Sequence, residues 1–297
     1  MSPSVFSFVR RITLMLAGSL LASAAFGQPG LAPLPGVASY ADRIEVRHDI
    51  VFGTEPYQKM DLYLPKGDGP FPVVICWFGG GFIGGDKRNI GPVAAFLAAR
   101  GFATVAPNYF IADKAGEHPG WPRNVHDAKA AVRFVRAHAK DWHLDSTRIV
   151  GLGYSSGAYL ALIVGFTPHL QELEGPGTAQ GESSAILAVV DISGVSDRRG
   201  SLGSTTTALL GKGYEQKDDL RVIASPIIYV GPNTVPVFIL QGDQDKTVDV
   251  SSARILAEAL QRFKVPHQLN IVPAGHDPIS AEAMESISSW VKERFSQ

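Results

Sequence analysis

The stretch from Thr147 to Ala161 limits the folds open to this chain more than any other part of the sequence. It begins with a short apolar run, passes through the small residues of Gly153–Gly157 and ends in residues that favour a helix. Its centre reads Gly-Tyr-Ser-Ser-Gly, which places Ser155 on a sharp turn between a strand and a helix. Flanking glycines let the strand and the helix approach closely. The stretch predicts a strand–turn–helix unit that presents a nucleophilic serine, and an ordinary strand–loop–helix junction is the alternative.

The rest of the chain alternates between apolar runs typical of strands and amphipathic runs typical of helices. Strands are expected at Ile44–Phe52, Met60–Leu64, Phe71–Phe78, Ala103–Ala106, Thr147–Leu152, Ile186–Ile192, Val235–Leu240 and His267–Val272. Helices are expected at Ile90–Ala99, Val125–Lys140, Ser251–Lys264 and Pro278–Phe295. The first two strands flank a turn and predict an antiparallel hairpin. The remainder predicts an α/β fold with a mostly parallel central sheet and helices on both faces.

Two long polar segments and one basic helix face are expected near the surface. The segments Pro168–Ser184 and Ser196–Arg221 have little periodicity, and each is either a lid or pocket wall or a plain surface loop. The helix Val125–Lys140 has apolar residues on one side. Its other side, which we expect to face solvent, carries Lys129, Arg133, Arg136 and Lys140.

The beginning of the chain has the composition of a targeting segment. Two adjacent arginines precede the uncharged apolar run Ile12–Phe26, and small residues follow as a cleavage site. A buried or membrane-spanning helix is the alternative, although a span needs about 20 apolar residues. We therefore assign residues 1–27 to a signal peptide, 28–42 to a Pro/Gly-rich linker and 43–297 to one α/β domain. Cleavage would leave an exported protein, periplasmic or secreted, without stable membrane insertion.

Charge and cysteine content argue against several classes of partner. The formal net charge of -1 gives no reason to expect binding to nucleic acid or to an anionic membrane. The single cysteine, Cys76, lies in an apolar run and is expected in the core, so no internal disulfide can form. No His/Cys cluster has the spacing of metal ligands, and His138 and His143 do not share a helix face. We expect neither a metal nor a cofactor.

Residues that could activate Ser155 follow later strands, in the order that serine chemistry requires. A serine hydroxyl needs a base to take its proton and an acid to orient that base. His276 directly follows the strand His267–Val272 and is the candidate base, whereas His267 enters that strand. The candidate acid is Asp245, which follows the strand Val235–Leu240.

Three aspartates lie on the loop that supplies the acid. Asp243 is close to the strand end, where a side chain is expected to cap the turn. Asp249 adjoins the next helix and suits a helix cap. Asp245 lies between them and is therefore the assignment.

A glycine-rich turn, Gly79–Gly81, comes directly after the buried strand Phe71–Phe78. Consecutive glycines let backbone N–H groups face a cleft without obstruction, and Ser156 adds an N–H at a helix start. A flexible turn or a phosphate-binding loop is the alternative. The phosphate loop would end in G-K-[ST], which Gly85–Lys87 does not supply.

Together these motifs resemble the α/β-hydrolase superfamily, and within it the carboxylesterases with an H-G-G-G type oxyanion loop. The chain is especially similar to small bacterial esterases grouped with feruloyl esterase, kynurenine formamidase and prenylcysteine methylesterase. The shared motifs run in family order from about Arg43 to Phe295. They are Met60–Pro65, Gly79–Phe82, Gly85–Lys87, Trp121-Pro122 before Asp127, the serine turn, Ser225–Ile227, Gly242–Val248 and Gly275-His276.

The resemblance implies an α/β-hydrolase fold and a role for each matching residue. By position, Ser155 is the nucleophile, His276 the base, Asp245 the acid, and Gly80, Gly81 and Ser156 the oxyanion-hole donors. Phe78 replaces the family's loop histidine, which removes any hydrogen bond by which that histidine would stiffen the loop.

The same resemblance implies hydrolysis of a small carboxylic ester through an acyl-enzyme, without a cofactor. An arylformamidase or other amide hydrolase would use the same groups, and a non-catalytic binding module of this fold is the remaining alternative. Because no long apolar insertion could form a lipase lid, we expect short acyl chains, from acetyl to about butyryl.

Overall fold

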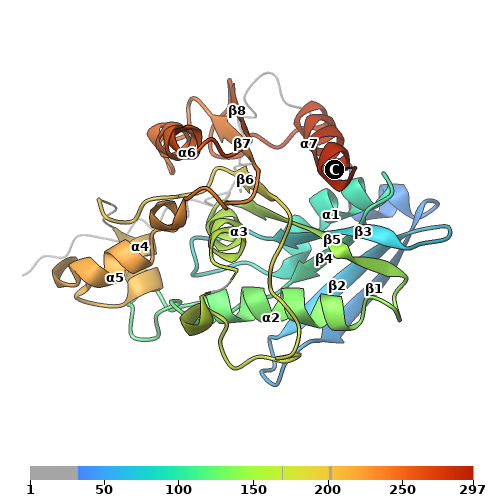
Figure 1. Ribbon diagram of the computed structural model, residues 1–297, viewed down its shortest axis with the longest axis horizontal. Coiled ribbons are helices and arrows are strands. Elements are labelled where there is room, and N and C mark those ends of the chain that lie inside the picture. Colours follow the sequence, from blue (N-terminus) through green and yellow to red (C-terminus); the bar gives the residue numbers. More distant parts are fainter. Residues whose placement is uncertain (1–32, 169, 201–202, 297) are drawn as a thin grey trace, which may run out of the picture. The chain divides into compact units, whose positions relative to one another are not determined.

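One eight-stranded sheet organises the domain (Figure 1). The computed structural model describes residues 33–168, 170–200 and 203–296. The strands are β1 (Ile44–Val51), β2 (Lys59–Pro65), β3 (Phe71–Trp77), β4 (Ala103–Pro107), β5 (Leu144–Tyr154), β6 (Val189–Ile192), β7 (Val237–Gly242) and β8 (His267–Val272), in the spatial order β1-β2-β4-β3-β5-β6-β7-β8. β2 pairs antiparallel with β1 and β4, and all other pairs are parallel. The predicted hairpin and the mostly parallel sheet are confirmed.

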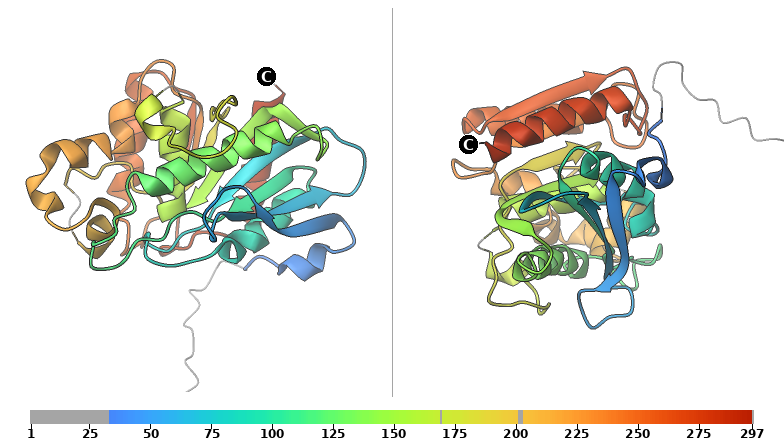
Figure 2. Two further views of the ribbon diagram at one scale, coloured as in Figure 1. Left: turned by 90° about the horizontal axis from the view of Figure 1, so that it is seen from below. Right: turned by 90° about the vertical axis from the view of Figure 1, so that its right-hand side faces the viewer.

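Helices cover both faces of this sheet (Figures 1 and 2). They are α1 (Gly91–Ala98), α2 (Arg123–Ala137), α3 (Ser156–Phe166), α4 (Ser204–Leu210), α5 (Asp218–Ile223), α6 (Ser251–Arg262) and α7 (Ala281–Phe295). Short 3-10 helices are η1 (Val37–Tyr40), η2 (Lys87–Ile90), η3 (Gln171–Leu173), η4 (Tyr214–Gln216) and η5 (Pro226–Tyr229). α1 and α7 pack together on one face, α2 and α3 pack on the other, and α6 contacts β7 and β8.

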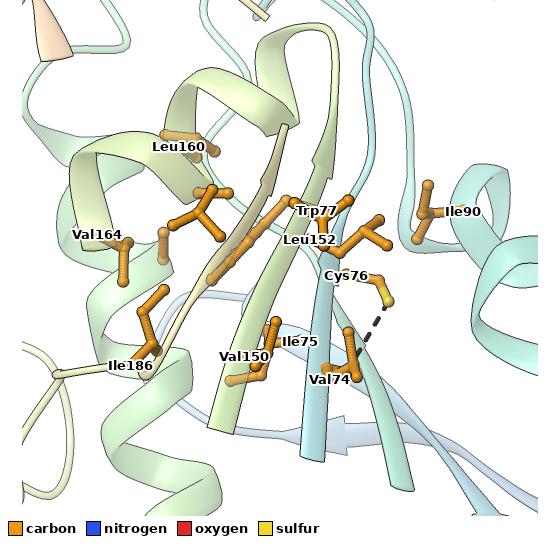
Figure 3. Close-up of a cluster of buried hydrophobic side chains, with 14 of the residues drawn as sticks. Val74, Ile75, Cys76, Trp77, Ile90, Val150, Leu152, Leu160, Val164 and Ile186 are labelled. Atoms are coloured by element: carbon orange, nitrogen blue, oxygen red, sulfur yellow. Dashed lines mark hydrogen bonds between the residues drawn. The ribbon is translucent and has the colours of Figure 1, made fainter. Parts of the chain in front are cut away.

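The central strand β3 shows why its sequence is a continuous apolar run. Residues Val73–Trp77 are buried because β4 and β5 pair with β3 on its two sides and helices cover both faces. Figure 3 shows Trp77 on the side of the sheet that faces α3, the helix that carries Leu160 and Val164. Cys76 points to the opposite face, toward Ile90 (Figure 3). Cys76 is a buried free thiol, as predicted, and burial raises its pKa.

The prediction that the basic side of α2 faces solvent is wrong for two of its four residues. The side chains of Lys129 and Arg133 are 0% and 2% exposed. Glu174, which follows η3, accepts from both of them, at 2.7 Å from Nζ and 2.6 Å from Nη1. The polar segment that begins at residue 170 therefore covers this side of α2. The carboxylate of Glu174 makes burial of the two cations possible, because it pairs with both. Arg136 is half-buried, and Lys140 is exposed as expected.

The other long polar segment, Ser196–Arg221, contains α4, η4 and the start of α5. The described part of the predicted linker, residues 33–42, includes η1, and Tyr40 packs edge-on against Phe96 of α1. The predicted signal peptide, residues 1–27, lies outside the described residues. Within the described ranges, no helix is both long enough and apolar enough to cross a bilayer.

Candidate active site

The serine turn joins β5 to α3 at the carboxyl edge of the sheet. Ser155 has φ 53° and ψ -117°, a combination that residues with a side chain rarely adopt. Its N–H donates to the carbonyl oxygen of Ile192 on β6, at 2.8 Å. A Cβ atom on Gly153 would overlap the carbonyl oxygen of Gly157, and one on Gly157 would overlap that of Trp77. The two glycines therefore permit the tight turn that holds the serine at the strand end.

Three strand ends bring Ser155, Asp245 and His276 together. Ser155 follows β5, Asp245 follows β7 and His276 follows β8, and all three strands are parallel. The distance from His276 Nε2 to Ser155 Oγ is 2.9 Å. The distance from His276 Nδ1 to Asp245 Oδ2 is 2.7 Å. With its proton on Nδ1, the imidazole donates to the carboxylate and leaves Nε2 free to accept the serine proton.

Asp245 is buried and firmly held. Besides His276, its Oδ2 accepts from the side-chain amide of Gln241 at 2.8 Å. Its Oδ1 accepts from the backbone N–H groups of Thr247, at 2.7 Å, and Val248, at 2.9 Å. Burial opposes ionisation, but the hydrogen bonds from His276 and from these N–H groups outweigh it and keep the pKa of Asp245 below its usual value. Asp245 therefore remains an anion that orients the imidazole.

The competing candidates have other contacts. Asp249 is exposed, and its Oδ1 accepts from the N–H of Ser251 at 2.9 Å, where α6 begins. Asp243 is also exposed, and its own N–H donates to the carbonyl oxygen of Val272. The ring of His267 contacts the carbonyl oxygen of Val265 through Nδ1. The contact of Asp249 fits the role expected for it at the start of the helix, whereas the contact of Asp243 is made by its backbone and not by its side chain.

Tyr109 anchors the glycine-rich turn through Phe78, the residue directly before the glycines. Its hydroxyl donates to the carbonyl oxygen of Phe78 at 2.8 Å and lies 3.3 Å from Oγ of Ser156. The rings of Tyr109 and Phe78 are stacked, with centroids 4.4 Å apart. Both residues are buried. Sequence reasoning missed this anchor because Tyr109 lies 31 residues further along the chain, in an irregular segment without periodicity.

Three backbone N–H groups are available to bind an oxyanion. Gly80 and Gly81 have φ values of 142° and 62°, which glycine adopts without strain. Ser156 is the first residue of α3, where a helix leaves its amides unpaired. Within the described part of the chain, no group accepts a hydrogen bond from the N–H of any of the three. All three residues line the pocket that contains Ser155.

This pocket has a volume of about 590 Å³, within the range of small-molecule sites. Ser155 and His276 contribute to its wall, together with Thr247 and Val248 from the loop that carries Asp245. Two residues of the polar segment Ser196–Arg221, Arg198 and Thr205, also line it. That segment therefore forms part of a pocket wall, which is one of its two predicted roles.

The alternative of a phosphate loop has no support in the contacts of Lys87. Its side chain is buried, and Nζ lies 2.6 Å from Oδ1 of Asp61. Among the described residues, no group of three His, Cys, Asp or Glu side chains is arranged to hold a metal ion.

Comparison with known proteins identifies the family of the chain. A family model described as BD-FAE matches residues 60–260. The chain belongs to the BD-FAE family. The match includes Ser155 and Asp245, and His276 lies beyond its end. Membership in this family, together with the sheet and its helices, places the chain among the α/β-hydrolases of the carboxylesterase group.

Several curated relatives of this chain are named as esterases. Esterase LipC of Mycobacterium tuberculosis is 27% identical over 77% of this chain and 59% of its own length. The probable isoprenylcysteine alpha-carbonyl methylesterase ICMEL1 of Arabidopsis thaliana is 28% identical over 73% of this chain and 48% of its own. The chain thus spans about half the length of these relatives. A truncated carbohydrate esterase from gut microbiota shares the fold, with a TM-score of 0.78, 23% identity and coverage of 86% of this chain and 98% of that one.

Proposed function

We propose that this chain is an exported serine carboxylesterase that hydrolyses a small carboxylic ester through an acyl-enzyme. One observation carries the proposal: Ser155 Oγ, His276 and Asp245 form a continuous hydrogen-bonded series, and Ser155 and His276 line a pocket of small-molecule size. The esterase names of the relatives support the type of bond that is cleaved.

The chemistry follows from these contacts. His276 Nε2 takes the proton from Ser155 Oγ as the oxygen attacks the ester carbonyl carbon. The N–H groups of Gly80, Gly81 and Ser156 stabilise the negative charge that develops on the carbonyl oxygen. His276 then gives its proton to the leaving alcohol, and an acyl group remains on Ser155. A water molecule, deprotonated by His276, releases the acid and restores the serine.

Short acyl chains fit the wall of this pocket. Two residues of the wall, Thr205 and the charged Arg198, come from the segment Ser196–Arg221, which is rich in Ser, Thr and Gly. A long aliphatic chain would gain little from burial against such groups. We therefore extend the proposal to acyl groups from acetyl to about butyryl.

The test is a panel of 4-nitrophenyl esters, from acetyl to palmitoyl, together with N-formylkynurenine. We expect the short esters to have the highest kcat/KM, and Ser155→Ala to lower kcat by on the order of 10⁴-fold or more while remaining folded. Hydrolysis that survives this substitution would exclude the serine mechanism. Faster turnover of N-formylkynurenine than of any ester would make the chain an amide hydrolase instead.

Export rests on the amino-terminal sequence alone. The basic residues and the apolar run Ile12–Phe26 support a signal peptide. Expression of the full chain in a bacterial host, fractionation and amino-terminal sequencing test it. We expect a mature protein beginning near Gln28 outside the cytoplasm, and an uncleaved cytoplasmic product would contradict this part of the proposal.

A further inference from the structure

Arg198 places a buried cation in the wall of the catalytic pocket. The residue is 3% exposed and lines the same pocket as Ser155 and His276. Its guanidinium carbon lies 5.3 Å from the ring centre of Phe82 and 5.1 Å from that of Tyr159. Two aromatic rings thus hold the planar group in one place, and cation–π attraction stabilises it there.

The charge of Arg198 has no carboxylate partner within the described residues. Its Nε has no hydrogen-bond acceptor there. The neighbouring Asp197 pairs with Arg199, at 2.6 Å between Oδ2 and Nη2. Burial lowers the pKa of Arg198 to about 10, and only the hydroxyl of Tyr159 opposes this shift. Arg198 therefore remains charged at neutral pH.

Among the described residues, the other buried cations are paired. Lys87 contacts Asp61 at 2.6 Å, and Lys129 and Arg133 share Glu174 at 2.7 and 2.6 Å. Burial of an ion is costly unless an opposite charge compensates it. For the cations away from the pocket, carboxylates of the chain itself supply the opposite charge. At Arg198, which lines the pocket, a bound ligand could supply it.

We propose that Arg198 binds a carboxylate group carried by the ester substrate. This inference rests on the proposed esterase function and names its substrate class. A guanidinium presents parallel N–H groups that match the two oxygens of a carboxylate. A ligand that brings such a group would satisfy the buried charge and be selected over a neutral ester of the same shape.

The surroundings of Arg198 place this carboxylate in the acyl part of the substrate. Phe82 follows the glycines of the oxyanion turn directly, and Tyr159 lies in the first turn of α3. The leaving alcohol departs beside His276, which protonates it, and Thr247 and Val248 line the pocket from the loop of its partner Asp245. The substrate class is therefore a half-ester of a short dicarboxylic acid.

Two matched pairs of esters test whether the enzyme prefers a substrate carboxylate, and whether that carboxylate belongs to the acyl part or to the alcohol part. Monomethyl succinate and methyl 4-methylpentanoate carry a carboxylate or an isopropyl group in the acyl part. Acetoxyacetate and isobutyl acetate carry the same two groups in the alcohol. We expect a higher kcat/KM for the charged ester in the first pair only. If neither charged ester is preferred over its neutral partner, the inference is overturned. If the charged ester is preferred only in the second pair, the acyl assignment is overturned.

Arg198→Gln tests the residue, and Arg199→Gln is its matched control. Arg199 is adjacent, half exposed and paired with Asp197 outside the pocket. We expect Arg198→Gln to reduce the charged-to-neutral ratio of kcat/KM roughly 10- to 100-fold, because one charge-assisted interaction is lost. Arg199→Gln should leave the ratio unchanged. Equal ratios in wild type and a folded Arg198→Gln would refute the assignment.

The wild-type comparison decides the question even if Arg198→Gln does not fold. Calorimetric titration of monomethyl succinate into Ser155→Ala adds a readout that needs no turnover, with methyl 4-methylpentanoate as the neutral reference. Equal affinities would contradict the inference. If wild type hydrolyses the neutral esters through Ser155 without preferring charge, only this inference fails. If it hydrolyses no ester at all, the proposed function fails, and calorimetry still measures carboxylate binding.

Discussion

Replacing Asp245 with asparagine should trap His276 in the wrong tautomer. Oδ1 accepts from two backbone N–H groups, and Oδ2 accepts from Gln241 and His276. An amide has one oxygen, so its NH₂ group must replace one of the two acceptors. If the NH₂ group took the position of Oδ1, it would face the N–H groups of Thr247 and Val248, and two hydrogen bonds would be lost. We therefore expect it at Oδ2, where it donates to Nδ1 of His276 and moves the imidazole proton to Nε2.

The protonated Nε2 cannot accept the proton of Ser155, because the two atoms, 2.9 Å apart, would then both be donors. A change of this kind lowers kcat by on the order of 10⁴-fold, equivalent to about 5 kcal/mol of transition-state stabilisation. Loss of the hydrogen bond from Gln241 should also cost about 1 kcal/mol of stability.

The assay is kcat for 4-nitrophenyl butyrate at neutral pH, with Asp243→Asn and Asp249→Asn as matched controls on the same loop. Both controls should keep most of the activity, and Asp249→Asn should lose at most about 1 kcal/mol of stability through a weakened helix cap. A folded Asp245→Asn variant with activity within tenfold of wild type would refute the reasoning. A large loss of kcat in Asp243→Asn or Asp249→Asn, without one in Asp245→Asn, would refute it as well.

Three further substitutions test one contact of the site and two buried charges of the fold. Tyr109→Phe removes the donor to the carbonyl of Phe78, so steady-state kinetics should show kcat about tenfold lower with little change in KM; unchanged kcat would deny Tyr109 a positioning role. Asp191 is a buried residue of β6, and burial raises its pKa from 3.8 to about 7. The native state therefore binds the proton more tightly, and wild-type stability falls as pH rises through that interval. Urea unfolding at pH 5 and 8 should show Asp191→Asn removing on the order of 2 kcal/mol of that loss, and equal losses would contradict the burial argument. Glu174→Gln leaves two buried cations without a carboxylate, so it should cost about 3 kcal/mol in urea with kcat preserved; a loss under about 1 kcal/mol would mean that the pairs contribute little.

The sheet and the candidate triad could be predicted because their signals are local. A buried parallel strand such as β3 is apolar throughout, and the turn at Ser155 requires glycines that the sequence displays. Asp245 and His276 follow strands directly, so the alignment of parallel strands brings them to one edge. Expected element boundaries differ from the observed ones by a few residues, as for α2, which begins two residues earlier than predicted.

The contacts that support the site, and those that bury the cations of α2, could not be predicted because their partners are distant in the sequence. Glu174 buries cations of α2 that look solvent-exposed from periodicity alone. Tyr109 restrains Phe78 from an irregular segment, where no pattern indicates its contacts. The position of Arg198 in the pocket depends on how the segment after β6 packs on Phe82 and Tyr159. Each of these depends on tertiary packing, which hydropathy along the chain does not encode.

Covalent capture of the nucleophile tests the central claim most directly. The protein is treated with diethyl 4-nitrophenyl phosphate, which transfers a diethylphosphoryl group to an activated serine, and the adduct is located by peptide mass spectrometry. We predict one adduct per chain, on Ser155, accompanied by complete loss of ester hydrolysis. The adduct should be absent from Ser155→Ala and form far more slowly in Asp245→Asn. Modification of another residue with loss of activity, or hydrolysis that persists with Ser155 fully modified, would contradict the account.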